Sequence, residues 1–328
     1  MNAIEQALTF LKNGKLVAIP TETVYGLGAD ARNPTALAQI YHIKGRPMTN
    51  PLIVHIPSIE AIHDWAIEIP ENALKVAHAF WPGPLTLILK RHPSVLDLVT
   101  GAQETIALRI PNHPLTLQLL AEFNGGIAAP SANRYGRLSP TTAEHVRAEL
   151  GDSVDYILDG GPCGVGIEST ILDLSQDFPA VLRPGHISVD ALETILKTDL
   201  HTKHHSKIIV PGSSESHYAP HKPLYLLEKD VLWETALHLT SKKKSFNLLS
   251  FEQKPKEMLL NINISPNQWI TEPCDPDRYA EKLYADLHDL DEEKVSCILV
   301  QCPPNTVQWE AVRDRLQRAA TALKQPLF

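Results

Sequence analysis

A short polar run, Ser131-Ala132-Asn133, follows an apolar stretch that ends at Ala129, and a second polar run, Lys44-Gly45-Arg46, lies far upstream. The Lys and Arg side chains can reach an anion from one extended loop. The hydroxyl, amide and backbone N–H groups of the Ser/Asn run offer a second cradle for phosphate or carboxylate. Either run alone is typical of an ordinary surface loop or turn. Together they favour an anion site, because the sequences of segments 20–28 and 81–86 are also unusual for loops with a purely structural role.

Length and composition narrow the class of protein. A chain of 328 residues has room for two domains. Its formal net charge of −8 argues against bulk binding of nucleic acid but allows a local basic cavity for a small polyanion such as a nucleotide. The four cysteines form no CxxC pair, no apolar run approaches about 20 residues, and no secretory leader is visible. We therefore expect a cytoplasmic chain with reduced thiols and no membrane partner.

Helix and strand signals alternate over the first 200 residues. Asn2 and Glu5 form a capping box for a first helix that ends at Gly14, and Asn33-Pro34 opens a second helix running to Ile43. The Thr/Gly segment 21–28 is predicted as a loop. Short apolar runs predict strands at 16–20, 52–56, 85–89, 106–110, 127–129, 156–158, 170–174 and 181–182, and helical patterns lie at 71–80, 113–123, 141–150 and 188–197. These elements indicate an α/β domain with a large, twisted, mixed sheet.

A second domain follows a linker. Periodicity is lost from residue 201, and the linker ends in His217-Tyr218-Ala219-Pro220. Beyond it, strands are predicted at 224–227, 246–251, 258–262 and 297–301, and helices at 230–240, 276–290 and 306–324. This alternation indicates a smaller, Rossmann-like α/β domain with a parallel sheet, and the absence of GxGxxG argues against a dinucleotide role. We divide the chain into a catalytic domain (1–200), a linker or lid (201–222) and a C-terminal domain (223–328).

Other polar residues lie where predicted strands and helices begin or end. Thr105 and Arg109 fall on one face of a strand, so that Arg109 is either a carboxylate clamp or part of a surface ion pair. Ser139 at a helix start is either a cap or a phosphate ligand. Six such loops supply Ser, Thr, Lys, Arg or Asn, which is hard to explain by turns alone. A metal site at His201, His204 and His205 has weak support, because the spacing is irregular and no Cys or carboxylate accompanies it.

These segments resemble the YrdC-type domain of L-threonylcarbamoyladenylate synthases. The signature tetrad of that family is KxR plus SxN, here Lys44, Arg46, Ser131 and Asn133. PTETVYGLG, KGRP, NPL, WPGPLTLIL, ALRIPNHP, APSAN, GIESTI and RPG recur in family order over residues 3–200. The HYAP run and the tail resemble the longer, two-domain members of the Sua type.

The resemblance implies synthesis of L-threonylcarbamoyladenylate from L-threonine, bicarbonate and ATP, with release of pyrophosphate. The product would serve the downstream machinery that transfers threonylcarbamoyl to tRNA adenosine, with a weak tRNA contact as an open possibility. Magnesium is expected with ATP, and no protein-built metal site is expected. Lys44 and Arg46 would also act in catalysis. Matched positions assign to ATP Lys44, Arg46, Asn50, Thr105, Ser131, Asn133, Ser139, Arg183 and Tyr218, and to threonine Thr23, His55, Arg109, Ala129 and Ser169.

Two other interpretations stay open from the sequence. A binding module could use the same basic cavity to hold RNA without chemistry, although the acidic total and Thr23, His55 and Arg109 favour small ligands. An accessory domain of the hydrogenase-maturation carbamoyltransferase kind shares the fold, but it would need zinc-finger and acylphosphatase segments that the chain lacks. The composition of the linker further predicts a lid over the nucleotide rather than a passive tether.

Overall fold

The computed structural model describes residues 2–202, 208–212, 217–251, 264–291 and 294–321. The chain divides into two compact units, each with its own sheet. The first unit comprises Met1–Tyr135 and Ser139–Ser213, and the second comprises Gly136–Leu138 and Ser214–Phe328. The short run of residues 136–138 therefore belongs by its contacts to the second unit, although it interrupts the first in sequence.

The first two helices begin as the sequence predicts. In α1 (Ala3–Lys12), the Glu5 backbone N–H donates to Asn2 Oδ1 at 2.8 Å, and the Asn2 N–H donates to the Glu5 carboxylate at 2.9 Å. Helix α2 (Pro34–Lys44) starts at Pro34. It continues one residue further than predicted, to Lys44, and is capped by Gly45, whose φ of 61° is left-handed. Lys44 therefore lies in the last turn of a helix and not in an extended loop.

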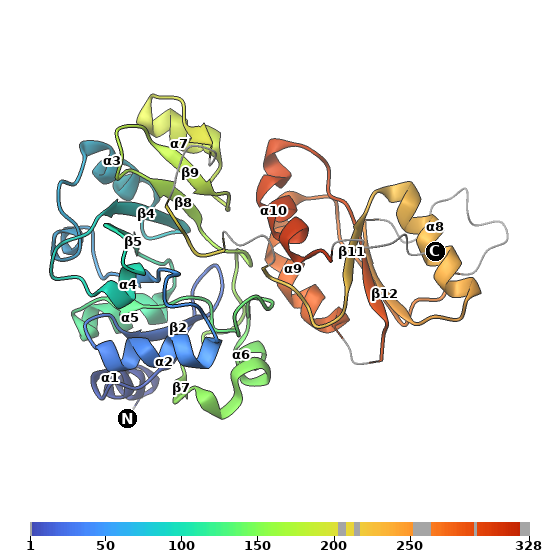
Figure 1. The fold of residues 1–328 in the computed structure, drawn as a ribbon, viewed down its shortest axis with the longest axis horizontal. Coiled ribbons are helices and arrows are strands. Elements are labelled where there is room, and N and C mark those ends of the chain that lie inside the picture. Colours follow the sequence, from blue (N-terminus) through green and yellow to red (C-terminus); the bar gives the residue numbers. More distant parts are fainter. Residues whose placement is uncertain (1, 203–207, 213–216, 252–263, 292–293, 322–328) are drawn as a thin grey trace. The chain divides into compact units, whose positions relative to one another are not determined.

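Ten of the described strands form one mixed sheet (Figure 1). Their order is β10-β9-β8-β4-β5-β3-β6-β2-β1-β7, and parallel and antiparallel neighbours both occur. This confirms the predicted large mixed sheet. The strands are β1 (Val17–Ile19), β2 (Gly26–Asp30), β3 (Ile53–His55), β4 (Leu85–Lys90), β5 (Thr105–Arg109), β6 (Ile127–Ala128), β7 (Tyr156–Ile157), β8 (Thr170–Asp173), β9 (Ala180–Arg183) and β10 (His201–Thr202).

Two strands correct the sequence interpretation. Strand β2 occupies a segment predicted as a loop, and its Gly28 pairs with Val17 of β1. A Cβ atom at Gly28 would lie 2.9 Å from the Val17 carbonyl oxygen, so the close approach of the two strands requires glycine here. Strand β10 pairs with β9 inside the region predicted as linker.

The helices of the first unit cover this sheet. The helices predicted at 71–80, 113–123, 141–150 and 188–197 are confirmed to within two residues, whereas α4 and two 3₁₀ turns were not predicted. In Figure 1, α3 and α7 lie side by side. The remaining elements are α3 (Glu71–Phe80), α4 (Asp97–Thr100), α5 (Pro114–Phe123), α6 (Ala143–Leu150), α7 (Val189–Leu196), η1 (Glu60–Asp64) and η2 (Gly151–Ser153).

The second unit has a four-stranded parallel sheet in its described residues, in the order β11-β14-β12-β13. The strands are β11 (Leu224–Leu227), β12 (Phe246–Ser250), β13 (Gln268–Thr271) and β14 (Cys297–Gln301). Figure 1 shows α8 (Lys229–Ser241) on one side of the sheet, with α9 (Pro276–Leu290) and α10 (Glu310–Ala319) on the other. A 3₁₀ turn, η5 (Val307–Trp309), precedes α10. This arrangement confirms the Rossmann-like second domain.

Strand β13 was not predicted from the sequence, and the strand expected at 258–262 lies outside the described residues. All four cysteines are free thiols. None of the helices in the described part of the chain is long and apolar enough to cross a bilayer.

Candidate functional site

Lys44 joins the two polar runs that open the sequence. Its Nζ donates to the Ser131 carbonyl oxygen at 2.6 Å and to the Asn133 carbonyl oxygen at 2.5 Å. The Lys44 carbonyl in turn accepts a hydrogen bond from the Tyr135 N–H at 2.7 Å. The end of α2 thus fixes the Ser131–Asn133 loop, so the structure brings Lys44, Ser131 and Asn133 together as predicted.

Arg46 lies beside Lys44 and is equally buried. Its guanidinium donates to the Pro51 carbonyl at 2.8 Å and lies 5.8 Å from the Tyr135 ring centroid. Burial and the neighbouring charge of Arg46 hold the pKa of Lys44 well below its usual range, with Glu149 opposing the shift. An anion bound between these two cations would relieve their repulsion. The side chain of Asn50 completes the group by donating to the Tyr135 hydroxyl at 3.0 Å.

A second buried cation, Arg109, organises a separate group. Its Nη1 donates to Thr23 Oγ1 at 2.9 Å, its Nε donates to the Gly83 carbonyl at 3.2 Å, and its Nη2 lies 2.7 Å from Glu22 Oε2. His55 of β3 is the register partner of Arg109 on the parallel strand β5. Burial and the charge of Arg109 lower the pKa of His55 to about 3, so the imidazole is neutral at physiological pH.

The loops that carry these two groups are joined through their backbones. The Ala132 N–H donates to the Tyr25 carbonyl at 2.8 Å, and the Leu27 N–H donates to the Pro130 carbonyl at 2.7 Å. At Gly26 a Cβ atom would lie 3.0 Å from the Cβ of Ala129. The Thr23 loop and the Ser131 loop are therefore held side by side, next to the paired strands β2 and β6 in the interior of the sheet.

A third group links the two sets of predicted residues directly. Arg183 Nη2 donates to Ser169 Oγ at 3.1 Å, and Ser169 Oγ lies 2.7 Å from Thr86 Oγ1. Ser139 Oγ donates to Glu168 Oε1 at 2.6 Å. Arg183 and Ser139 were assigned to the nucleotide and Ser169 to the amino acid, so the two assignments meet within this cluster.

Two domain families match the chain in the same order as the two units. The family described as "Telomere recombination" matches residues 9–185, and "Threonylcarbamoyl-AMP synthase, C-terminal domain" matches residues 187–321. The threonylcarbamoyl-AMP synthase of Bacillus subtilis (strain 168) is 40% identical over 327 residues, which cover 97% of this chain and 92% of that protein. This chain belongs to the threonylcarbamoyl-AMP synthase family.

Further relatives agree over nearly the whole chain. The threonylcarbamoyl-AMP synthase of Schizosaccharomyces pombe is 34% identical, covering 98% of this chain and 89% of that protein. The crystal structure of Pyrococcus abyssi Sua5 complexed with L-threonine superposes with a TM-score of 0.87 at 34% identity. The superposition covers 97% of this chain and 94% of that one. The similarity to these relatives therefore extends over both units.

Thr105 and Tyr218 were both assigned to the nucleotide from the sequence. Thr105 begins β5 opposite Lys90 of β4, whereas Arg109 ends the same strand. Four residues of a strand span about 13 Å, so the shared face predicted from period 2 does not bring Thr105 and Arg109 together. Tyr218 belongs to the second unit, where it is 1% exposed and its ring lies 5.2 Å from the Arg315 guanidinium carbon. Its assignment to ATP stays a prediction.

Two buried carboxylates were missed by the sequence interpretation. Glu22 lies in the quoted Thr/Gly segment and Glu168 in GIESTI, and both are in contact with residues that the sequence did single out. A charged residue between two threonines in an otherwise small, apolar loop was the available signal for Glu22. Thr86 and Tyr135 were also missed, and each contacts an assigned residue through its hydroxyl or ring.

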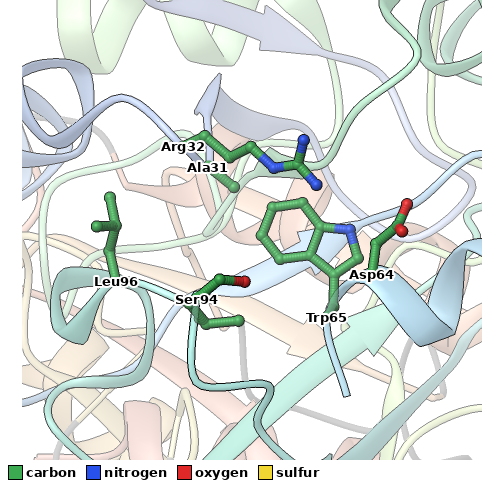
Figure 2. A pocket seen from close by; sticks show the side chains of 7 residues that line it. Ala31, Arg32, Asp64, Trp65, Ser94 and Leu96 are labelled. Carbon is green, nitrogen blue, oxygen red and sulfur yellow. The ribbon is translucent and has the colours of Figure 1, made fainter. Parts of the chain in front are cut away.

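Figure 2 shows a cavity of about 260 Å³ elsewhere in the first unit. The Arg32 guanidinium carbon lies 5.2 Å from the Trp65 ring centroid, and Asp64 and Ser94 line the same space. No residue of the site predicted from the sequence lines this cavity. This cavity is therefore separate from the site predicted from the sequence.

A pH dependence follows from the buried, neutral His55. Below pH 6.5 an unfolded chain protonates this histidine, whereas the folded chain does so only near pH 3. The unfolded state then binds more protons, so folding stability falls as the pH falls from about 6.5 to about 3, by on the order of 1 kcal/mol per pH unit. We expect His55→Gln to lose this slope in urea unfolding measured at several pH values. His63→Gln, at an exposed position, should keep it, and equal slopes in both variants would contradict the prediction.

Proposed function

We propose that the group around Lys44 and Arg46 holds the triphosphate of ATP and that the group around Thr23, His55 and Arg109 holds L-threonine. The chain synthesises L-threonylcarbamoyladenylate, as its family does. The observation that carries this placement is the pair of backbone hydrogen bonds between the Thr23 loop and the Ser131 loop. Two substrates held on joined loops meet without a large movement of the chain.

The chemistry needs positioning and charge neutralisation more than a nucleophilic side chain. The amine of threonine and bicarbonate combine to give a carbamate and water. A carbamate oxygen then attacks the α-phosphorus of ATP, and pyrophosphate leaves. Lys44 and Arg46 would neutralise the charge that moves onto the leaving pyrophosphate, which makes them the residues that lower the barrier. Ser131, Asn133, Asn50, Ser139 and Arg183 would orient the nucleotide.

The threonine side is supported by its charge and its hydroxyl groups. Arg109 offers a buried cation for the carboxylate, while Thr23 and the backbone beside Ala129 lie on the joined loops. The hydroxyl of Ser169 lies in the group with Thr86 and Arg183. The related Pyrococcus abyssi structure was solved with L-threonine. Because Arg109 would bind the carboxylate, it would select an amino acid over amines that lack a carboxylate.

We propose that magnesium arrives with the triphosphate. Within the described residues no group of three His, Cys, Asp or Glu side chains is arranged to hold a metal ion. The carboxylate of Glu168 is engaged by Ser139. The phosphate oxygens of ATP would therefore be the main ligands of the magnesium ion. Bound there, the ion would neutralise part of the phosphate charge.

The product is suited to a cytoplasmic role in tRNA modification. We propose that the labile adenylate passes to the machinery that transfers threonylcarbamoyl to the adenosine next to the anticodon. The free thiols of all four cysteines support a reducing compartment. The net charge of −8 allows at most a weak, local contact with tRNA.

A pyrophosphate-release assay tests the proposed reaction directly. Release should require threonine, bicarbonate, ATP and magnesium together, and omission of any one should reduce it to background. Chromatography should detect the adenylate in the complete mixture. Pyrophosphate release without bicarbonate would exclude the carbamate route.

Selectivity for threonine over valine tests the amino-acid pocket. Valine has nearly the same shape but a methyl group in place of the hydroxyl, so the buried hydroxyl groups of Thr23, Ser169 and Thr86 would lose a partner. We expect kcat/KM for valine to be lower by at least about 100-fold. Steady-state pyrophosphate release with each amino acid measures the ratio, and equal values would mean that the pocket lies elsewhere.

A further inference from the structure

Glu22 and Arg109 form a buried pair whose capacity for hydrogen bonds is only partly used. Side-chain exposure is 11% for Glu22 and 4% for Arg109, and Glu22 Oε2 lies 2.7 Å from Arg109 Nη2. Despite this short distance the two groups are not aligned for a hydrogen bond, and among the described residues neither oxygen of Glu22 nor Arg109 Nη2 has a hydrogen-bond partner. The other two nitrogens of Arg109 are engaged by Gly83 and Thr23. The pair is thus held in place through two nitrogens of Arg109, while its remaining buried polar atoms are unsatisfied within the described residues.

Unused buried donors and acceptors are costly unless a ligand satisfies them. Here the unused groups are a carboxylate that lacks donors and a guanidinium N–H that lacks an acceptor, next to each other. A molecule with a donor and an acceptor close together satisfies both, and a cationic donor beside an anionic acceptor gives the strongest hydrogen bonds. A zwitterionic α-amino acid has this arrangement, with its ammonium and carboxylate on one carbon.

The titratable side chains near Glu22 and Arg109 add no further charge to this pair of one carboxylate and one guanidinium. Burial and the charge of Arg109 lower the pKa of His55 to about 3, so it adds no positive charge. Burial raises the pKa of the Cys163 thiol to about 12, and the negative charge of Glu22 adds to that shift. Burial also lowers the pKa of His113. The surroundings of Glu22 and Arg109 are therefore close to electroneutral.

We propose that Glu22 is a specificity-determining residue that receives the ammonium group of threonine while Arg109 receives the carboxylate. Glu22 then makes the pocket select a zwitterion over an anion of the same shape. This inference rests on the proposed location of the threonine site at Arg109. It concerns binding of the amino acid before carbamate formation.

The alternative is that Glu22 serves only to hold Arg109 in position. Glu22→Gln separates the two roles, because it keeps the size of the side chain and removes its charge. The probe is 2,3-dihydroxybutanoate, in which a hydroxyl replaces the ammonium of threonine. In Glu22→Gln we expect KM for threonine to rise about tenfold or more and the inhibition constant of 2,3-dihydroxybutanoate to fall about tenfold or more, with KM for ATP unchanged.

Two further variants complete the comparison. Glu22→Asp keeps the charge, so it should keep the preference for threonine over the anion even if threonine binds less tightly. Glu71→Gln, in an exposed ion pair with Lys75, is the matched control and should leave all three constants unchanged. A purely structural role predicts that Glu22→Gln weakens threonine and the anion alike, and this result would overturn the inference.

The wild-type chain provides a test that needs no variant. Threoninol, which lacks the carboxylate, and 2,3-dihydroxybutanoate, which lacks the ammonium, should each bind at least about tenfold more weakly than threonine. Binding of the anion as tight as that of threonine would overturn the inference even if Glu22→Gln did not fold. Failure of the underlying site is distinguishable, because Arg109→Met would then leave KM for threonine unchanged.

Discussion

Replacing Lys44 or Arg46 by alanine should reduce kcat/KM for ATP by at least about 30-fold, equivalent to about 2 kcal/mol of transition-state stabilisation. Both cations are buried beside each other, and burial together with Arg46 lowers the pKa of Lys44. A site that holds two cations close together in the absence of ligand gains most when a polyanion arrives. Charge that develops on the departing pyrophosphate would strengthen the interaction further.

Lys44 has a second role that the experiment must separate from charge neutralisation. Its Nζ bonds the carbonyls of Ser131 and Asn133, so Lys44→Ala leaves two buried acceptors without this donor. This loss costs stability as well as activity. Arg46→Ala leaves the Lys44 contacts to the loop in place, which makes it the cleaner test of the triphosphate assignment.

The measurement is steady-state pyrophosphate release at saturating threonine and bicarbonate, with circular dichroism to show that each variant folds. Lys75→Ala is the matched control, because Lys75 lies on the surface in an ion pair with Glu71. It should retain normal kinetics. Near-normal turnover in both Lys44→Ala and Arg46→Ala would refute the assignment.

Strong local signals allowed most of the fold to be predicted from the sequence. The first helix was readable because Asn2 and Glu5 form a capping box, which depends on neighbours three residues apart. Strand β2 could not be predicted from the sequence because glycine has a low propensity for β-strands. Its glycines fit there because β2 pairs closely with β1 and β6. Strand β13 consists of half-buried residues without an apolar run, so tertiary pairing with β12 defines it.

The sequence singled out residue types for a candidate site but not the contacts between them. The sequence placed Lys44 and Ser131 in one site, yet the bonds from Lys44 Nζ to backbone carbonyls depend on where α2 ends. Period 2 placed Thr105 and Arg109 on one face, but it does not report the distance along the strand. Glu22 was not predicted as a site residue because its contact is with Arg109, which lies 87 positions away in the chain.

The segment around Tyr218 carries the second large prediction. In the second unit the Ala219 N–H donates to the Gly136 carbonyl at 2.8 Å, and Arg137 Nη1 donates to the Pro220 carbonyl at 3.2 Å. Gly136 follows Asn133 by only three residues. The segment His217–Pro220 is therefore hydrogen-bonded to residues 136–137, which follow the Ser131–Asn133 loop in the chain. That this segment acts as a lid over the nucleotide stays a prediction from the sequence.

Removing the lid should leave a folded but poorly productive domain. A chain that ends at Gly212 keeps Pro211, whose carbonyl accepts from Arg183 Nη1 at 3.0 Å, and loses the whole segment from residue 213 onward. The core clusters of the first unit use residues up to Val210, all of which this chain keeps, so circular dichroism should show a folded domain. Without the lid, water would reach the carbamate and the adenylate, and we expect the yield of adenylate per ATP consumed to fall at least about tenfold.

Variants of the full chain distinguish a lid from a tether. Tyr218 and Tyr284 are both buried in the second unit with ring centroids 5.9 Å apart, so Tyr218→Ala and Tyr284→Ala remove comparable packing. Both should lower the free energy of unfolding, but only Tyr218→Ala should also lower the yield of adenylate at a temperature where both variants are folded. Equal yields from the two variants, or full activity from the chain that ends at Gly212, would show that the segment only connects the domains. A selective loss in Tyr218→Ala would instead assign the ring to the closed site, because packing in the second unit is disturbed equally in both variants.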